Sequence, residues 1–254
     1  MVRAFIILLF FSACKNDAGQ PDSVLPDSTT ISAKGDLSDS VLSRQLERRD
    51  LPDSISFKGK FVQAFSYNDK NGESIIVFST VNEYPSPKVE MNEDEISSEL
   101  HVSRYKIKEG SISRDWEWEG GVMNCPFDIT SQFITDATTI TDLNNNGIAE
   151  ICYQVMESCR SDVSSSGKRL VMLEGKSIYT LKGSMWLAQS PEQVMDITAE
   201  NVNLKTQTIP KDEWEAISFR DGRYENDDSF EKAPKEFLNH ARSQWLRFVK
   251  ESFD

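Results

Sequence analysis

The fold is decided by a stretch that reads ISFKGKFVQAFSY (55–67), NDKNGE (68–73) and SIIVFSTV (74–81). The first segment alternates between apolar and polar residues well enough to form a strand, and the third is a second apolar run of strand length. Asn71 and Gly72 between them form the dipeptide that favours a tight turn between antiparallel strands. The stretch therefore predicts a β-hairpin.

Further hairpins are predicted downstream. Two alternating strands come first, ELHVSRYKIK (99–108) and RDWEWE (114–119). The second hairpin joins TITDL (139–143) to IAEICYQVM (148–156), and the third joins RLVML (169–173) to SIYTL (177–181). A fourth hairpin is expected from AISF (216–219), a turn at 220–222 and the short strand 223–224.

The spacing of the apolar residues changes at the C-terminus from that of a strand to that of a helix. Pro234 suits a first helical turn, and apolar residues then recur at helical spacing at Phe237, Ala241, Trp245, Phe248 and Val249. We expect a β-rich fold, all-β to α+β, in which antiparallel hairpins form a sheet or sandwich closed by one C-terminal amphipathic helix. The chain has 254 residues, and a single globular domain is expected over 51–254.

The N-terminus has the features of an export signal. Arg3 precedes an unbroken apolar run from Ala4 to Phe11, and two small residues then lead to Cys14. The ending FSAC resembles the lipobox of bacterial lipoproteins, which implies cleavage of residues 1–13 and lipidation of Cys14. The alternative is an ordinary secretory signal with an incidental cysteine. Either way, a run this short does not span a bilayer as a helix.

Residues 14–50 are expected to form the lipid anchor and a flexible tether. They are rich in Ser, Asp and Pro and poor in large apolar residues, so they cannot bury enough surface to offset chain entropy. The stretch 37–51 is an exception, because its leucines and Val41 have helical spacing and predict a short helix docked on the domain.

The composition limits the classes of partner that the protein can bind. The net charge of −13 argues against binding of nucleic acid or anionic lipid through a basic patch. An exported chain can form disulfides, and three cysteines remain when Cys14 is lipidated. Cys125 and Cys159 lie in loop-like contexts and are predicted to pair, whereas Cys152 lies in an apolar strand and is expected to be free and buried.

One loop has metal-ligand spacing, Asp142-Leu-Asn-Asn-Asn-Gly-Ile-Ala-Glu150. Oxygen-bearing side chains at Asp142, Asn144 and Asn146, the Ile148 carbonyl and Glu150 suit a calcium ion. The twelfth position is Tyr153 rather than glutamate, so this is not an EF-hand. The alternative is a plain turn closed by Asn-Gly, which needs no metal.

The strand RDWEWE offers two further candidates. Trp116 and Trp118 share one face and would form a sugar-stacking platform if exposed, although such a pair is more often core. Glu117 and Glu119 are the nearest carboxylate pair for glycoside hydrolysis, but acids at this spacing on a strand usually form a solvated face.

Several segments together resemble a family of surface lipoproteins from Bacteroidota-type bacteria, labelled as surface polysaccharide biosynthesis proteins. They are TDLNNNGIAEI (141–151), CRSDVS (159–164), LVMLEGKSIYTLKG (170–183) and APKEFLNHARSQWLRFV (233–249). The resemblance implies a lipid-anchored protein at the outer membrane or cell surface with a link to surface glycan, and it carries no catalytic residues.

Three functions remain open from sequence. The first is a non-enzymatic module that binds or organises surface glycan or an envelope protein, stabilised by calcium. The second is an enzyme acting on polysaccharide, although the chain lacks G-x-S-x-G, H-E-x-x-H, P-loop and G-x-G-x-x-G motifs. The third is a purely structural lipoprotein.

Overall fold

The computed structural model describes residues 41–87, 94–188, 190 and 192–251. The chain divides into two units, Met1–Asp36 and Leu37–Asp254, and all the described residues belong to the second. The expected export signal and the lipidation site at Cys14 therefore lie outside the described residues. None of the helices in the described part is both long and apolar enough to cross a membrane.

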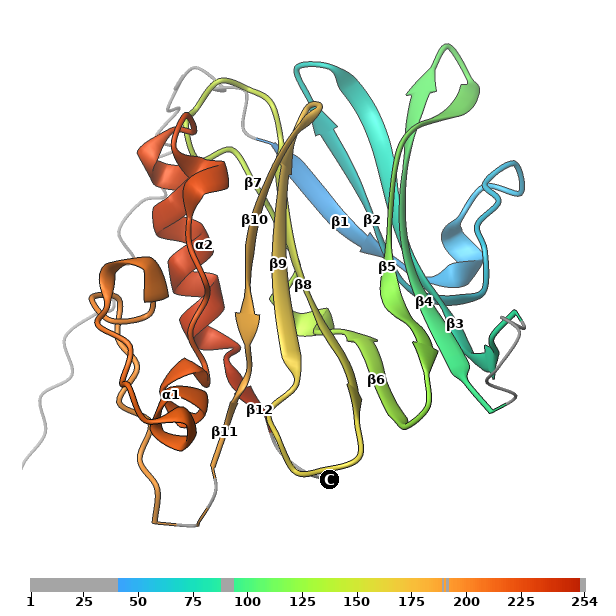
Figure 1. Ribbon diagram of the computed structural model, residues 1–254. Helices are drawn as coiled ribbons and strands as arrows, with labels where there is room; N and C mark the ends of the chain where they lie inside the picture. The colour runs from blue at the N-terminus through green and yellow to red at the C-terminus, as the bar shows by residue number, and fades with distance from the viewer. Residues whose placement is uncertain (1–40, 88–93, 189, 191, 252–254) are drawn as a thin grey trace, which may run out of the picture. The chain divides into compact units, whose positions relative to one another are not determined.

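Two antiparallel sheets form the body of the second unit, as the predicted β-rich fold requires (Figure 1). The N-terminal sheet contains, in spatial order, β1 (Leu42–Leu46), β2 (Lys60–Asp69), β3 (Gly72–Pro85), β4 (Ile96–Lys108) and β5 (Ser111–Cys125). The central sheet contains β10 (Ser177–Ser184), β9 (Gly167–Glu174), β8 (Glu150–Arg160) and β6 (Asp128–Phe133), with β7 (Thr139–Thr141) also pairing with β8.

The remaining elements lie beyond the central sheet in sequence. They are the parallel pair β11 (Trp186–Leu187) and β12 (Lys250–Glu251), and the helices α1 (Glu213–Arg220) and α2 (Lys235–Arg247). Short 3-10 turns occupy Arg48–Asp50, Thr135–Ala137, Leu204–Thr206 and Asp228–Phe230. The C-terminal helix predicted from sequence is present as α2.

The main core lies between the two sheets. Phe78 of β3 is fully buried there and makes edge-to-face contacts with Phe133 of β6 and Tyr153 of β8, at ring-centroid distances of 5.3 and 5.4 Å. Such aromatic pairs add about 1 kcal/mol each beyond their buried area. Because β8 alternates, Ile151, Tyr153 and Val155 face this core while Cys152 faces the opposite side.

The other face of the central sheet is covered as well, as is part of the other face of the N-terminal sheet. On the central sheet, Leu170 and Met172 pack in one buried cluster with Phe237 and Trp245 of α2, and α2 lies along this face in Figure 1. On the N-terminal sheet, residues 46–61 cover Ile75, Val77 and Tyr105. Strand β3 is consequently buried on both faces, which explains its unbroken apolar run.

Two sequence predictions need correction. The expected helix within 37–51 is replaced at 42–46 by β1, which pairs with β2, so residues assigned to the tether belong to the folded unit. The expected fourth hairpin is replaced by α1. The Asp212 side chain accepts hydrogen bonds from the backbone N–H groups of Trp214 and Glu215, both at 3.0 Å, and this cap favours a helix.

The predicted disulfide is confirmed. Cys125 at the end of β5 is bonded to Cys159 of β8, so the bridge joins the two sheets covalently. Cys152 is free and buried, as expected, and burial raises the pKa of its thiol to about 12.

Candidate functional site

The loop before β8 curls around the side chain of Asp142. Its two carboxylate oxygens accept hydrogen bonds from the backbone N–H groups of Asn146 and Gly147, each at 3.0 Å. Asn145 and Gly147 have positive φ angles of 56° and 80°, which bends the chain back on itself. The geometry places the polar side chains of the loop close to its first residue.

Glu150 is the buried member of this group. It is 0% exposed, and its Oε2 accepts hydrogen bonds from Leu143 N at 2.8 Å and Thr141 Oγ1 at 3.2 Å. Its Oε1 is buried and has no hydrogen-bond partner. Burial, together with the charges of Glu174 and Asp142, raises the pKa of Glu150 to about 7. A buried carboxylate with an unpartnered oxygen is costly unless a cation compensates it.

Glu174 joins the group, although the sequence analysis did not single it out. It ends β9 and lies directly opposite Glu150 in the β8–β9 ladder. Its Oε1 accepts hydrogen bonds from the side-chain amides of Asn144 at 3.0 Å and Asn146 at 2.7 Å. Only the strand register reveals this neighbour, because Glu174 belongs to the next hairpin along the chain.

Hydrogen bonds join Asp142, Asn144 and Asn146 within the loop. Glu150 is joined to the loop through Leu143 N rather than through these side chains. Ile148 lies between Asn146 and Glu150 in the sequence, and its backbone N–H donates to Asn146 Oδ1 at 2.7 Å. Within the part of the chain that the structure describes, Asp142, Glu150 and Glu174 form no salt bridge. Three carboxyl groups without a basic partner concentrate negative potential at this loop.

The loop also contacts the turn between β2 and β3 of the other sheet. Lys70 N donates to Gly147 O at 2.7 Å, and Ala149 N donates to Asp69 Oδ2 at 3.1 Å. The predicted Asn-Gly hairpin of the N-terminal sheet therefore fixes the position of the predicted loop of the central sheet. An ion bound in the loop would strengthen the junction between the two sheets.

The two tryptophans of β5 that were weighed as a sugar-stacking platform take part in core packing. Trp116 and Trp118 are partly buried and pack against the core between the sheets. The Trp118 ring makes an edge-to-face contact with Tyr153 at 5.5 Å, and the Arg169 guanidinium lies 5.7 Å from its centroid. The indoles are used in packing because their face of the strand is the one turned toward the central sheet.

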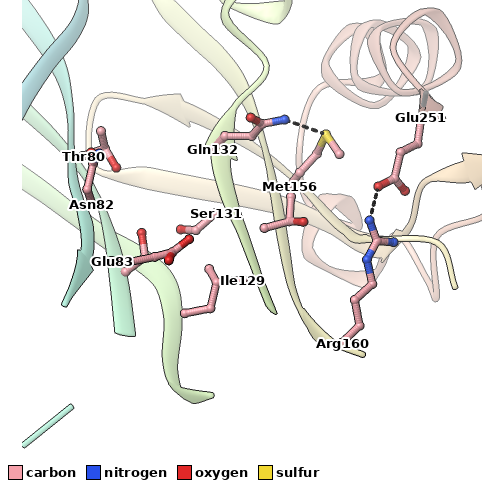
Figure 2. A pocket seen from close by; sticks show the side chains of 11 residues that line it. Thr80, Asn82, Glu83, Ile129, Ser131, Gln132, Met156, Arg160 and Glu251 are labelled. Carbon is pink, nitrogen blue, oxygen red and sulfur yellow. Dashed lines mark hydrogen bonds and ion pairs between the residues drawn. The ribbon is translucent and has the colours of Figure 1, made fainter. Parts of the chain in front are cut away.

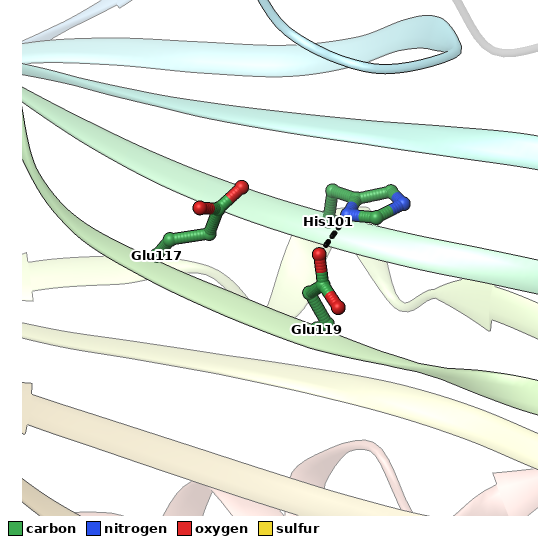
Figure 3. Close-up of side chains that lie close together, drawn as sticks. All are labelled: His101, Glu117 and Glu119. Carbon is green, nitrogen blue, oxygen red and sulfur yellow. Dashed lines mark ion pairs between the residues drawn. The ribbon is translucent and has the colours of Figure 1, made fainter.

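Glu117 and Glu119, which alternate with these tryptophans, lie on the other face of β5, beside His101 of β4 (Figure 3). The His101 side chain is buried, and its Nε2 lies 2.7 Å from Glu99 Oε2. Although burial opposes it, hydrogen bonds from Lys58, Tyr84 and His101 lower the pKa of Glu99 to about 2. Glu117 and Glu119 accordingly face a histidine on an open sheet surface rather than each other across a cleft.

A polar cavity of about 690 Å³ lies between the ends of the two sheets (Figure 2). Hydroxyl and amide side chains line much of it, and Arg160 and Glu251 form an ion pair at one side with a nitrogen–oxygen distance of 2.8 Å. The lining residues come from β3, β4, β6, β8 and β12: Thr80, Asn82, Ser98, Ser131, Gln132 and Met156, among others.

A second cavity, of about 620 Å³, carries an exposed tryptophan on its wall. Trp214 in the first turn of α1 is 78% exposed, and Asp196, Asp221 and Arg223 line the same cavity. Arg223 is itself buried and donates from Nη1 to Phe219 O at 2.7 Å. The cavity therefore combines an accessible aromatic face with fixed polar groups, a combination typical of ligand sites.

Sequence reasoning missed Trp214 because it assigned residues 216–219 to a strand and made no assignment for the residues just before them. The sequence does contain a helix-start pattern, Asp212 followed three residues later by Glu215, which would have placed Trp214 on a helix surface.

Comparison with models of known protein families, with curated proteins and with solved structures finds no match to this chain.

Proposed function

We propose that this protein is a calcium-binding, non-enzymatic module of the bacterial cell envelope, attached to the outer membrane or cell surface through lipidated Cys14. Its ligand is surface polysaccharide. One observation carries the calcium proposal: Glu150 is fully buried beside the Asp142 loop and its Oε1 has no partner. In this proposal α2 serves as the amphipathic helix that closes the domain.

The donor set of the loop fits a hard cation. Asp142, Asn144, Asn146, the Ile148 carbonyl and Glu150 offer only oxygens, and Glu174 supplies another carboxylate within reach of both asparagines. Calcium takes six to eight oxygen ligands and tolerates irregular geometry, whereas magnesium demands a tighter octahedron. The three acids supply enough charge for affinity in the range of extracellular calcium modules, with a dissociation constant of about 0.1–1 mM.

A calcium-dependent melting temperature tests this proposal. A ligand that binds only the folded state at ten to a hundred times its dissociation constant stabilises it by about 1–3 kcal/mol. For a domain of this size we therefore expect the melting temperature of the full chain to rise by about 3–10 °C between EDTA and about 10 mM calcium.

Matched substitutions complete this test. Asp142→Ala should abolish the calcium-dependent rise. Asp136→Ala removes an exposed aspartate from the preceding 3-10 turn and should leave the rise intact. Magnesium at the same concentration should produce a smaller shift. A melting temperature that is indifferent to calcium in the unmodified chain would reduce the loop to a turn and withdraw the calcium proposal.

The polysaccharide proposal rests on a different observation, the exposed Trp214 ring beside Asp196, Asp221 and Arg223. An indole face stacks on the apolar face of a sugar ring, and charged or polar neighbours bind its hydroxyls. We expect Trp214→Ala to abolish retardation of the protein in gels that contain polysaccharide extracted from the cells that produce it. Ile217→Ala, which removes an exposed aliphatic side chain from the same helix, should have little effect. Equal retardation of all three proteins would exclude this surface.

A further inference from the structure

A second metal-ligating cluster lies on the outer face of the N-terminal sheet, separate from the loop at Asp142. His101 of β4 is directly opposite Glu119 of β5, and Glu117 lies two residues along the same strand. One potential ligand atom from each residue lies within 4.8 Å of the other two, and Figure 3 shows both carboxylates on the Nδ1 side of the His101 ring. Among the residues that the structure describes, no other His, Cys, Asp and Glu side chains form such a trio.

The hydrogen bonding of His101 determines which ring nitrogen faces the acids. Its Nε2 lies 2.7 Å from Glu99 Oε2, and a carboxylate accepts a proton there, so the network assigns the N–H to Nε2. In the neutral ring Nδ1 then carries a lone pair. Glu119 Oε1 lies 3.6 Å from Nδ1, which is longer than a hydrogen bond. The imidazole is 96% buried, and its contact with Glu99 holds it in place.

We propose that His101 Nδ1, Glu117 and Glu119 bind one divalent first-row transition-metal ion, for which Zn²⁺ is the natural probe. An imidazole with two carboxylates is a donor set that zinc accepts, whereas calcium prefers oxygen alone. Glu99 is the positioning residue, because a carboxylate that accepts the other ring N–H orients a metal-binding histidine. Exposure of Glu117 and Glu119 leaves further coordination positions open to water.

Two basic residues lie near the same cluster and affect its affinity for zinc. Arg114 pairs with Glu117 at 3.0 Å, and Lys58 binds Glu99 at Oε2, the oxygen that also contacts His101 Nε2. Arg114 is 47% exposed, so metal binding can displace its guanidinium into solvent at little cost. Removing that competitor by Arg114→Gln should therefore tighten zinc binding.

The chain contains only two histidines, which makes the test direct. Imidazole nitrogens of the full chain are observed by ¹⁵N NMR during titration with Zn²⁺, in buffer with enough calcium to saturate the Asp142 loop. We expect the Nδ1 resonance of His101 to shift on zinc addition. His240, whose Nε2 is 2.9 Å from Thr139 Oγ1, should not shift and serves as the internal control.

Matched variants then assign the ligands. Glu119→Gln and Glu117→Gln should each weaken zinc binding at least about tenfold, and Glu99→Gln about tenfold through loss of orientation. Glu73→Gln removes an exposed carboxylate elsewhere on the same sheet and should leave the affinity unchanged. Asp142→Ala should also leave it unchanged, so failure here is distinguishable from failure of the calcium proposal.

Three results would overturn the proposal. The first is a His101 spectrum that does not respond to excess zinc. The second is a zinc response that persists at full strength in Glu117→Gln and Glu119→Gln. The third is a metal-free His101 that already carries a proton on Nδ1 at neutral pH, because the ring would then pair with Glu119 as an imidazolium and hold no lone pair for a metal.

Discussion

Replacing Glu150 by glutamine should remove a loss of stability that the metal-free protein undergoes as the pH rises. The buried Glu150 carboxyl has a folded-state pKa of about 7 against an ordinary value of 4.5. Between these values the folded state holds a proton that the unfolded chain releases, so this group favours folding at low pH. The advantage is fully present below pH 4.5 and is lost as the pH rises through about 7.

The size of the effect follows from the same pKa. A rise from 4.5 to about 7 corresponds to about 3 kcal/mol, of which about 2–3 kcal/mol falls between pH 5 and pH 8. In EDTA, the free energy of unfolding of the wild-type chain should therefore fall by that amount, relative to Glu150→Gln, over this interval. Glutamine has the same shape but does not titrate, so it keeps the packing and removes the proton.

Urea unfolding followed by tryptophan fluorescence at pH 5, 6, 7 and 8 measures the difference. Glu73→Gln, an exposed carboxylate, serves as the control and should keep the wild-type slope. Saturating calcium should cancel the slope in the wild type, because a bound cation holds Glu150 ionised. Calcium affinity should accordingly be about tenfold weaker at pH 6 than at pH 8. Identical pH slopes for wild type and Glu150→Gln in EDTA would refute the reasoning.

Three further outcomes are expected. Reduction of Cys125–Cys159, whose cysteines are 34 positions apart in the sequence, should cost about 4 kcal/mol of stability by chain entropy, measured as the shift of the urea midpoint with reductant. Lys168→Met should cost about 1–3 kcal/mol in the same assay, because the buried Lys168 Nζ donates hydrogen bonds to the carbonyls of Trp245 and Phe248 at the end of α2. Trp118→Ala should cost about 3–5 kcal/mol as a core truncation, whereas Trp214→Ala should change stability by less than about 0.5 kcal/mol. Equal losses for the two tryptophan variants would contradict the roles assigned to them.

Local sequence predicted much of the fold because most strands here are joined by short turns. The hairpin around Asn71-Gly72 and the turn at Glu174-Gly175-Lys176 both carry their pairing information within a few residues. The disulfide was predictable for a similar reason, since its two cysteines lie near strand ends, Cys125 as the last residue of β5 and Cys159 as the last but one of β8. By contrast, β1 pairs with a strand that begins fourteen residues further on, and its own residues have helical spacing.

The segment at α1 shows a different difficulty. Four apolar-rich residues, AISF, fit a strand and a helical turn equally well, and periodicity cannot separate them at that length. The capping pattern at Asp212 decides the matter in the structure, where it satisfies two N–H groups of the first turn. Trp214 is carried to the surface as a result, so an error about one short element hid the more exposed aromatic candidate.

The candidate sites were predictable only where one loop contains them. Asp142, Asn144, Asn146 and Glu150 lie within nine residues, whereas Glu174 reaches the loop through strand register alone. His101 and Glu119 face each other for the same reason, across the β4–β5 ladder. Composition and spacing do not contain this register. It is set by which face of each strand is buried, because a slip of one residue would exchange the two faces.

The two proposed metal sites differ in whether they join the two sheets or lie within one of them, and the effect of a bound ion differs accordingly. The loop at Asp142 joins the turns of both sheets through Lys70 and Asp69, so calcium there should stabilise the whole domain. The His101 cluster lies within one sheet, between neighbouring strands that already share a full ladder of hydrogen bonds. Each ion binds only the folded state, so each stabilises it by an amount set by the ratio of its concentration to its dissociation constant. At equal ratios, calcium and zinc should therefore raise the melting temperature equally, but only calcium acts on the contact between the two sheets.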